Sequence, residues 1–227
     1  MESESKSRWG NNVPRDIFSC KDIKDLFPSA KFVVCVRDIR AFLLSYQGKW
    51  KVTGKSHVER LRKLYHPVVT SYLWKSSMRQ IMILEKTIPS SDRVIVRYED
   101  LVSMPEKTVR KICSVIEEEF DPSMLEITTN NSSEATQGDG IFSTSVDRWL
   151  TGLTPEEITI SQYVSSSELK QFGYSKVKTS PNIIRVFGIL FKTPVALWEA
   201  LDANKDVRGP LIPYLYRRLG LLFGMGK

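Results

Sequence analysis

Two short apolar runs, at residues 32–36 and 94–98, set the frame of this chain. The first is Phe-Val-Val-Cys-Val, and the second is Val-Ile-Val followed by Arg97 and Tyr98. A run without polar alternation is typical of a strand that is buried on both faces of a parallel sheet. We therefore predict two such strands, at 31–36 and 94–98.

Helical patterns fill the intervals around these strands. Ser103 with Glu106, and Thr154 with Glu157, have the spacing of a capping box, which marks the first turn of a helix. Strands that alternate with helices indicate an α/β fold with a parallel sheet flanked by helices. The predicted helices cover 19–27, 39–51, 57–86 with a restart near Pro67, and 106–117.

The chain divides into three parts by composition. Residues 1–8 are polar and are expected to form a disordered start. Residues 9–178 form the α/β domain, in which 128–140 is rich in Asn, Ser and Gly and is predicted to be a loop. Residues 179–227 form a helical extension that is both apolar and basic.

The extension, from residue 183 onward, has two interpretations. Its large apolar residues are interrupted by Arg185, Lys192 and Pro194, which makes it a poor transmembrane span. It either packs on the domain or lies as an interfacial helix on a membrane, a peripheral contact through 183–227. We favour packing, which predicts that four side chains are buried: Phe187, Leu190, Phe191 and Trp198.

Composition and charge limit the classes of ligand and partner that we expect for this chain. The net charge is +7, which suits an anionic ligand such as a nucleotide, nucleic acid, sulfated glycan or acidic lipid. The chain has no long Lys/Arg block and no zinc-finger, RNA-recognition or basic-zipper signature, so we expect no nucleic-acid partner. The three Cys are far apart and the two His lack companion ligands at metal spacing. We therefore expect neither a disulfide framework nor a metal site.

Candidate binding residues follow the first strand directly. Arg37 stands where that strand ends, and ligands of open α/β sheets bind at the carboxyl ends of strands. Ser45 comes eight positions later, a little over two helical turns along. A guanidinium and a hydroxyl that converge there would form a phosphate clamp. A surface salt bridge between Arg37 and Asp38 or Arg40 is the alternative, and these residues alone do not separate the two.

Four segments, in order along the chain, resemble the sulfotransferases that use 3′-phosphoadenosine 5′-phosphosulfate (PAPS). Arg37-Asp-Ile-Arg, with Ser45 after four further residues, is similar to the family's 3′-phosphate-binding segment. The other three are Trp9-Gly-Asn-Asn-Val-Pro14, Arg97-Tyr-Glu-Asp-Leu101, and the C-terminal set made of 146–149, 153–157 and 172–174.

The resemblance implies a P-loop-NTPase-like parallel sheet and transfer of a sulfuryl group from PAPS to a hydroxyl or amine, for example of a carbohydrate. It also implies that Arg37 and Ser45 hold the 3′-phosphate, that Tyr98 lies near the adenine and that Arg148 adds charge near the nucleotide. It assigns no catalytic residue. A cytoplasmic location is expected for the chain as given, and a Golgi or membrane-associated one for a full-length eukaryotic relative.

Two departures from the family pattern concern catalysis. The family binds the 5′-phosphosulfate with a Gly- and Ser/Thr-containing loop between its first strand and a helix, and no such loop precedes Arg37. Asn12 and Val13 stand where the family has Lys and Thr. We therefore expect a domain without its first strand and phosphate loop, incomplete for catalysis. The alternatives are a non-catalytic scaffold that binds a membrane or partner, and a relative of nucleotide kinases.

Overall fold

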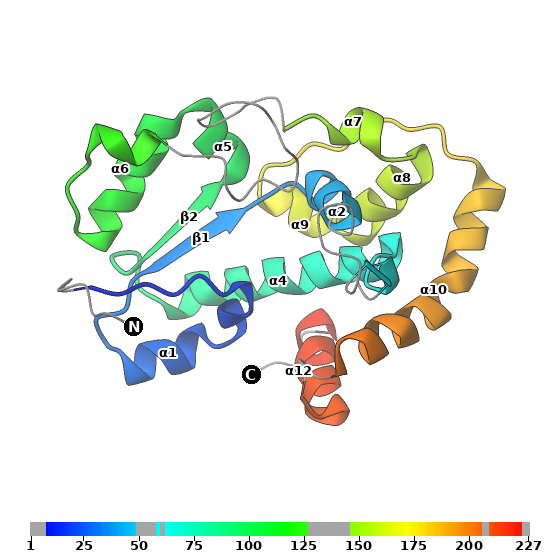
Figure 1. Cartoon of the computed structure of the whole chain (residues 1–227), viewed down its shortest axis with the longest axis horizontal. Helices are drawn as coiled ribbons and strands as arrows, with labels where there is room; N and C mark the ends of the chain where they lie inside the picture. Colours follow the sequence, from blue (N-terminus) through cyan, green and yellow to red (C-terminus); the bar gives the residue numbers. More distant parts are fainter. Residues whose placement is uncertain (1–7, 49–57, 60–61, 127–145, 206–208, 224–227) are drawn as a thin grey trace.

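Two parallel strands lie at the centre of the structure (Figure 1). The computed structural model describes residues 8–48, 58–59, 62–126, 146–205 and 209–223. Strand β1 (Phe32–Val36) pairs in parallel with β2 (Arg93–Arg97), and Val34 lies opposite Ile95. The connection passes through helices α2 (Ile39–Gly48) and α4 (Pro67–Thr87), as a parallel pair requires. The predicted α/β fold with a parallel sheet is confirmed.

The helix boundaries show which local signals were strong. Thr154 caps α8 (Pro155–Val164) in a complete capping box: its hydroxyl accepts from the Glu157 N–H, and a Glu157 carboxylate oxygen accepts from the Thr154 N–H at 2.9 Å. The predicted box at Ser103 is wrong, because Ser103 is the last residue of helix α5 (Tyr98–Ser103). Met104 precedes helix α6 (Pro105–Ile116) instead, without a side-chain cap.

The second strand ends one residue earlier than predicted. Tyr98 begins α5, and Glu99 and Asp100 stand in the first turn of that helix. Acidic residues in a first turn are favoured by the partial positive charge of the helix N-terminus. The remaining described elements are η1 (Pro14–Phe18), α1 (Cys20–Leu26), η3 (Pro122–Leu125), α7 (Trp149–Gly152), α9 (Ser166–Gln171), α10 (Ile183–Ala203) and α12 (Leu211–Phe223).

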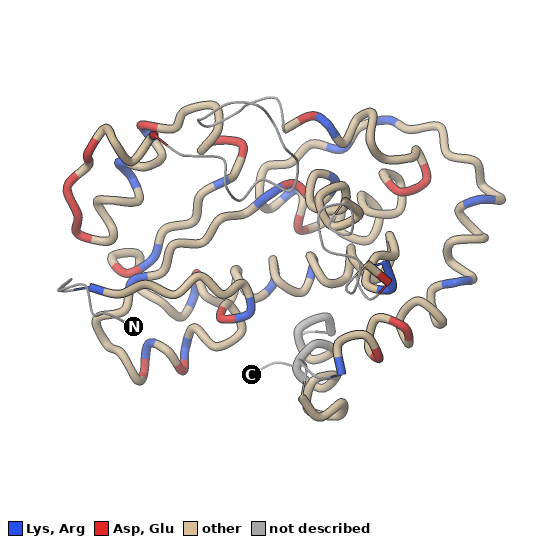
Figure 2. Tube along the Cα trace, in the orientation of Figure 1, with Lys and Arg blue, Asp and Glu red and all other residues tan. Residues whose placement is uncertain are grey.

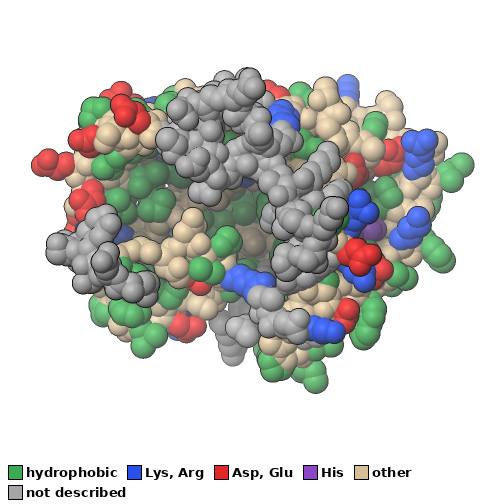
Figure 3. Space-filling view, in the orientation of Figure 1, with side chains coloured by type: hydrophobic (Ala, Val, Ile, Leu, Met, Phe, Trp, Pro, Cys, Tyr) green, Lys and Arg blue, Asp and Glu red, His purple; other side chains and the backbone are tan. Residues whose placement is uncertain are grey.

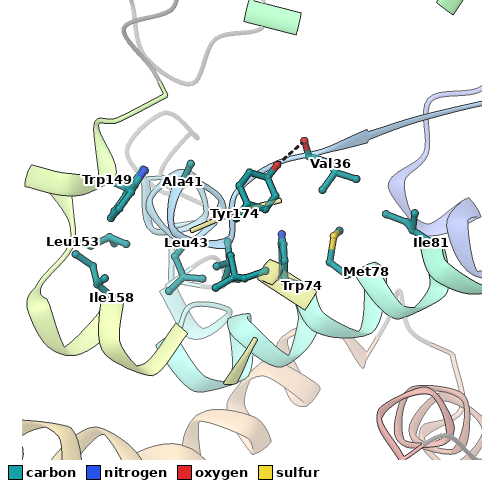
Figure 4. Close-up of a cluster of buried hydrophobic side chains, with 12 residues drawn as sticks. Val36, Ala41, Leu43, Trp74, Met78, Ile81, Trp149, Leu153, Ile158 and Tyr174 are labelled. Atoms are coloured by element: carbon teal, nitrogen blue, oxygen red, sulfur yellow. Dashed lines mark hydrogen bonds between the residues drawn. The ribbon is translucent and has the colours of Figure 1, made fainter. Parts of the chain in front are cut away.

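Helix α4 contributes several buried side chains to the main core. Its side chains Trp74, Met78 and Ile81 are buried in the same cluster as Val36 at the end of β1 (Figure 4). The C-terminal part of the domain closes this cluster with further buried side chains: Trp149, Leu153, Ile158, Leu169 and Tyr174. The carboxyl end of β1 is therefore held by segments that lie far apart in the sequence.

The face of the sheet that carries Val33, Cys35, Val94 and Val96 is only half covered. Val94 and Val96 of β2 are buried, and α6 contacts that strand. Their register partners Val33 and Cys35 are exposed, so the expectation that the first strand is buried on both faces is wrong. The reason is that α6 covers the β2 side of this face, whereas no described helix covers the β1 side.

The C-terminal extension is helical, as predicted, but its packing differs from the expectation. Helix α10 contacts α4 and α8, but Phe187, Leu190, Phe191 and Trp198 are all exposed. Apolar density alone therefore predicted burial wrongly. None of the described helices is long and apolar enough to cross a bilayer. The predicted disordered start at 1–8, apart from residue 8, and the predicted loop at 128–140 lie outside the described residues.

Candidate functional site

Three of the four resembling segments meet at the carboxyl ends of the strands. Arg37 and Asp38 follow β1, Tyr98 and Glu99 follow β2, and Tyr174 follows α9. Lys/Arg and Asp/Glu positions lie close together at these strand ends (Figure 2). The geometry of this cluster shows which charged side chains pair with one another.

The Glu99 carboxylate is the centre of the cluster. One oxygen accepts a hydrogen bond from the backbone N–H of Asp38 at 3.0 Å, and the other accepts from the Tyr174 hydroxyl at 2.8 Å. The Arg97 Nε lies 4.0 Å from that second oxygen. A single side chain thus links the end of β1, the start of α5 and the segment after α9.

Tyr174 reaches this position through a tight turn at Gly173. Gly173 has a φ of +74°, a left-handed conformation that glycine adopts without strain. The Tyr174 N–H then donates to the Leu169 carbonyl at 2.8 Å, which closes the end of α9 in the manner of a Schellman motif. This turn sends the tyrosine back toward the sheet, where its hydroxyl also lies 3.4 Å from the Val36 carbonyl oxygen (Figure 4).

The surroundings of Tyr174 keep its hydroxyl protonated. Burial, and next the Glu99 carboxylate, raise the pKa of this phenol well above its usual range. The Arg97 guanidinium lies over the ring, 4.4 Å from its centroid. Tyr174 is therefore a fixed hydrogen-bond donor that positions Glu99, and it is unsuited to act as a general base.

Arg37 is held at its backbone and faces an aromatic ring. The Trp74 indole N–H donates to the Arg37 carbonyl at 2.9 Å, which fixes the chain as it leaves β1. The Arg37 guanidinium carbon lies 4.4 Å from the centroid of the Tyr98 ring. Two residues that the sequence predicted for the same ligand therefore lie in contact, one from each strand end.

Asp38 pairs with Arg40 rather than with Arg37. Both residues are buried, the Arg40 Nε donates to Asp38 at 2.9 Å, and a second Arg40 nitrogen donates to Gln162 at 3.0 Å. The Arg40 guanidinium also lies over the Trp149 ring. This buried network joins α2 to the C-terminal part of the domain, and the Asp38 carboxylate forms its ion pair with Arg40.

The other predicted binding residues lie around this cluster. Ser45 is half-buried on α2, and Arg148 is exposed at the N-cap of α7, a helix that packs on α2. That Arg37 and Ser45 hold one phosphate, and that Arg148 adds charge near the nucleotide, stay predictions. The fourth resembling segment is placed by Trp9, whose ring makes an edge contact with Phe27 with centroids 5.7 Å apart.

A shallow hollow of about 500 Å³ adjoins Tyr174 on the α9 side. Lys170 and Lys176 line it, and Lys176 donates to the Ser166 hydroxyl at 2.6 Å. The hollow is separate from the contact between Arg37 and Tyr98. Among the described residues, no group of His, Cys, Asp and Glu is arranged to hold a metal ion.

Sequence reasoning missed the part that Glu99 and Tyr174 play. Both belong to segments that carried the resemblance, but a hydrogen bond across 75 positions leaves no periodic signal. The available signal was chemical: an acid directly after one strand, and a tyrosine after a glycine that ends a helix.

The family comparison covers three of the four resembling segments, those at 9–14, 37–45 and 97–101. Residues 1–122 match the family model described as "Sulfotransferase family". No curated protein matched the sequence. The similar solved structures include two sulfotransferase domains. The sulfotransferase domain from the Synechococcus PCC 7002 olefin synthase has 22% identity and a TM-score of 0.52, and the match covers 71% of this chain and 56% of that one.

The second is the sulfotransferase domain from the curacin biosynthetic pathway, with 18% identity and a TM-score of 0.48 over 73% of this chain and 60% of that one. The chain thus spans less than two thirds of the length of either solved domain. The described arrangement, a small parallel sheet with many helices, is a sulfotransferase-like α/β fold.

Proposed function

Because the chain belongs to the sulfotransferase family, we propose that the carboxyl ends of β1 and β2 form a nucleotide site for PAPS, the donor of a sulfuryl group. The observation that carries this proposal is the contact between Arg37 and Tyr98 at the strand ends. A cation beside an aromatic ring offers a partner for a phosphate and a surface for a base. Open α/β sheets bind ligands at this edge.

Each predicted residue has a role in the proposal. Arg37 and Ser45 bind the 3′-phosphate, Tyr98 lies near the adenine, and Arg148 adds positive charge. Arg forks pair with two phosphate oxygens at once, which favours Arg over Lys at such a position. Inside the protein, the Asp38 carboxylate pairs with the Arg40 guanidinium.

The reaction we propose for the family scaffold is sulfuryl transfer to a hydroxyl or amine, with a carbohydrate as acceptor. The protein's contribution to such a transfer is positioning and stabilisation of charge on the transferred and leaving oxygens. The described residues before β1 contain no strand that leads through a Gly- and Ser/Thr-containing loop into a helix. We propose that residues 1–227 bind the nucleotide without turnover.

The membrane-peripheral alternative, in which the scaffold is non-catalytic, is supported by one observation: the exposed apolar side of α10. In this alternative the nucleotide site is the same as in the main proposal. The difference is that no sulfuryl transfer follows nucleotide binding.

Calorimetry with adenosine 3′,5′-bisphosphate tests the nucleotide site. Hydrogen bonds to charged groups contribute about 1.5–3 kcal/mol, so Arg37→Ala should weaken binding by roughly tenfold or more. The affinity of Arg37→Lys should lie between that of the wild type and that of Arg37→Ala, because Lys keeps the charge but loses the forked guanidinium. Arg110→Ala on α6 is the matched control: it removes one exposed cation from another part of the protein and should leave affinity unchanged.

Adenosine 5′-monophosphate makes the test specific for the 3′-phosphate. If Arg37 binds that group, the wild type should prefer the bisphosphate, and Arg37→Ala should abolish the preference. Equal affinity of wild type and Arg37→Ala for the bisphosphate would reject the site, and so would an equal loss in Arg110→Ala.

A further inference from the structure

Helix α10 presents an apolar strip to the outside of the molecule. Successive residues of an α-helix are about 100° apart, so six of its side chains fall within roughly one third of the circumference. Each of the six is between 60% and 87% exposed. We call them the outer face: Ile183, Ile184, Phe187, Phe191, Val195 and Trp198.

The outer face is not what attaches the helix to the domain. The opposite side of α10 carries half-buried small or β-branched residues such as Val186, Thr193 and Ala196, and it packs on α4 and α8. The start of the helix is fixed as well. The Asn182 side chain caps the N–H groups of Ile184 and Arg185, while its own N–H donates to Glu156 at 2.8 Å. The strip is thus a preformed surface on an anchored helix.

The charges beside the outer face are positive. Arg185 and Lys192 are both exposed, and no Asp or Glu occurs in α10 before Glu199. Figure 2 shows these two basic positions ahead of the acidic ones near the end of the helix. Residues 183–227 as a whole carry seven Lys or Arg and three Asp or Glu. An anionic partner therefore complements this part of the chain.

The shape of the face selects the kind of partner. Helix α10 lies at the rim of the molecule, and its apolar and basic side chains project outward there (Figures 1 and 3). From Ile183 to Trp198 the strip is about 22 Å long, and none of the described helices can cross a bilayer. A protruding strip rich in Phe and Trp with Arg and Lys at its side is typical of a helix that lies in a membrane interface.

We propose that the outer face of α10 docks on the surface of an anionic lipid bilayer, with the helix parallel to the membrane plane. The apolar side chains enter the boundary between headgroups and acyl chains, and Arg185 and Lys192 reach the headgroup phosphates. This proposal is independent of the nucleotide site and would keep that site at a fixed height above the membrane.

Sedimentation with vesicles tests the apolar contribution. The full chain should bind phosphatidylcholine vesicles that contain phosphatidylserine, and bind vesicles of phosphatidylcholine alone more weakly. Burial of a large apolar side chain is worth roughly tenfold in partitioning, so Phe187→Ser with Phe191→Ser should lower binding by at least about tenfold. The control pair, Leu26→Ser with Tyr163→Ser, removes two exposed apolar side chains from α1 and α8 and should bind like the wild type.

A second pair of variants tests the charge. Lys192→Glu should weaken binding by about fivefold or more, since a basic residue near an anionic surface contributes on the order of 1 kcal/mol. Lys86→Glu makes the same change in net charge at the exposed end of α4 and should have little effect. Added salt should weaken wild-type binding. Because the substituted side chains are exposed, every variant should keep the wild-type circular dichroism and melting temperature.

Three results would overturn the proposal. One is the absence of wild-type binding to the anionic vesicles, and another is equal binding by the outer-face pair and the control pair. The third is self-association without lipid that Phe187→Ser with Phe191→Ser removes, because the outer face would then belong to a second copy of the chain.

Discussion

The bond between Tyr174 and Glu99 gives the sharpest prediction for the site. Tyr174→Phe removes one hydroxyl and keeps the ring, so the core packing and the contact with the Arg97 guanidinium remain. The lost bond runs to a carboxylate at 2.8 Å, and such bonds contribute about 1.5–3 kcal/mol. Glu99 keeps its bond from the Asp38 N–H, which places the expected loss near the lower end, at about 2 kcal/mol.

Urea denaturation measures this loss as a lower midpoint with an unchanged slope. Tyr163→Phe is the matched control: Tyr163 is exposed on α8, so removing its hydroxyl should change stability by less than about 0.5 kcal/mol. A double-mutant cycle with Glu99→Gln should give a coupling of about 1 kcal/mol or more, because the two side chains are in direct contact.

Two results would refute the reasoning. The first is a Tyr174→Phe variant as stable as Tyr163→Phe. The second is a double variant whose loss equals the sum of the single losses within about 0.5 kcal/mol. Either result would mean that Glu99 does not hold the segment after α9 against the strand ends.

Three further predictions concern other parts of the molecule. Arg40→Ala should destabilise the fold by about 3–5 kcal/mol in thermal or chemical denaturation, because it strands the buried Asp38 carboxylate. Burial lowers the pKa of His66, which also faces the Ile189 carbonyl and Lys192. The unfolded state therefore binds a proton more readily than the folded state, so the free energy of unfolding should fall as the pH drops below about 6.5. His66→Gln should reduce this loss of stability at low pH. Residues 1–227 should show no sulfuryl transfer from PAPS in a radiolabel assay. The described residues before β1 hold no loop of donors for the transferred group, and loss of even one such donor costs about 10²–10³ in rate. Robust turnover would contradict this prediction.

The strands and the fold class were predictable from local composition. The runs at 32–36 and 94–98 are short and β-branched, and few other structures accommodate such runs between helical segments. The Thr154 capping box was equally local and is confirmed. The box at Ser103 failed because the competing helix α5 extends to that residue, and no pattern in the sequence signals a six-residue helix there.

The site was only partly predictable. Arg37 could be placed at a strand end because that position depends on one strand alone. The Glu99–Tyr174 bond depends on how α9 ends and where its last turn points, which tertiary packing determines. The exposure of Phe187 and Trp198 was missed for a related reason: the sequence shows that α10 is apolar but does not say which side its neighbours cover.

The half-covered sheet has a consequence for behaviour in solution. Val33 and Cys35 are exposed on β1, and no strand among the described residues pairs with the outer edge of β1. Natural sheets protect such edges with Lys, Pro or bulges, and the five residues of β1 contain neither Lys nor Pro. At high protein concentration, this edge favours intermolecular strand pairing, so storage and crystallisation of the chain should be limited by slow β-rich aggregation rather than by loss of the helical core.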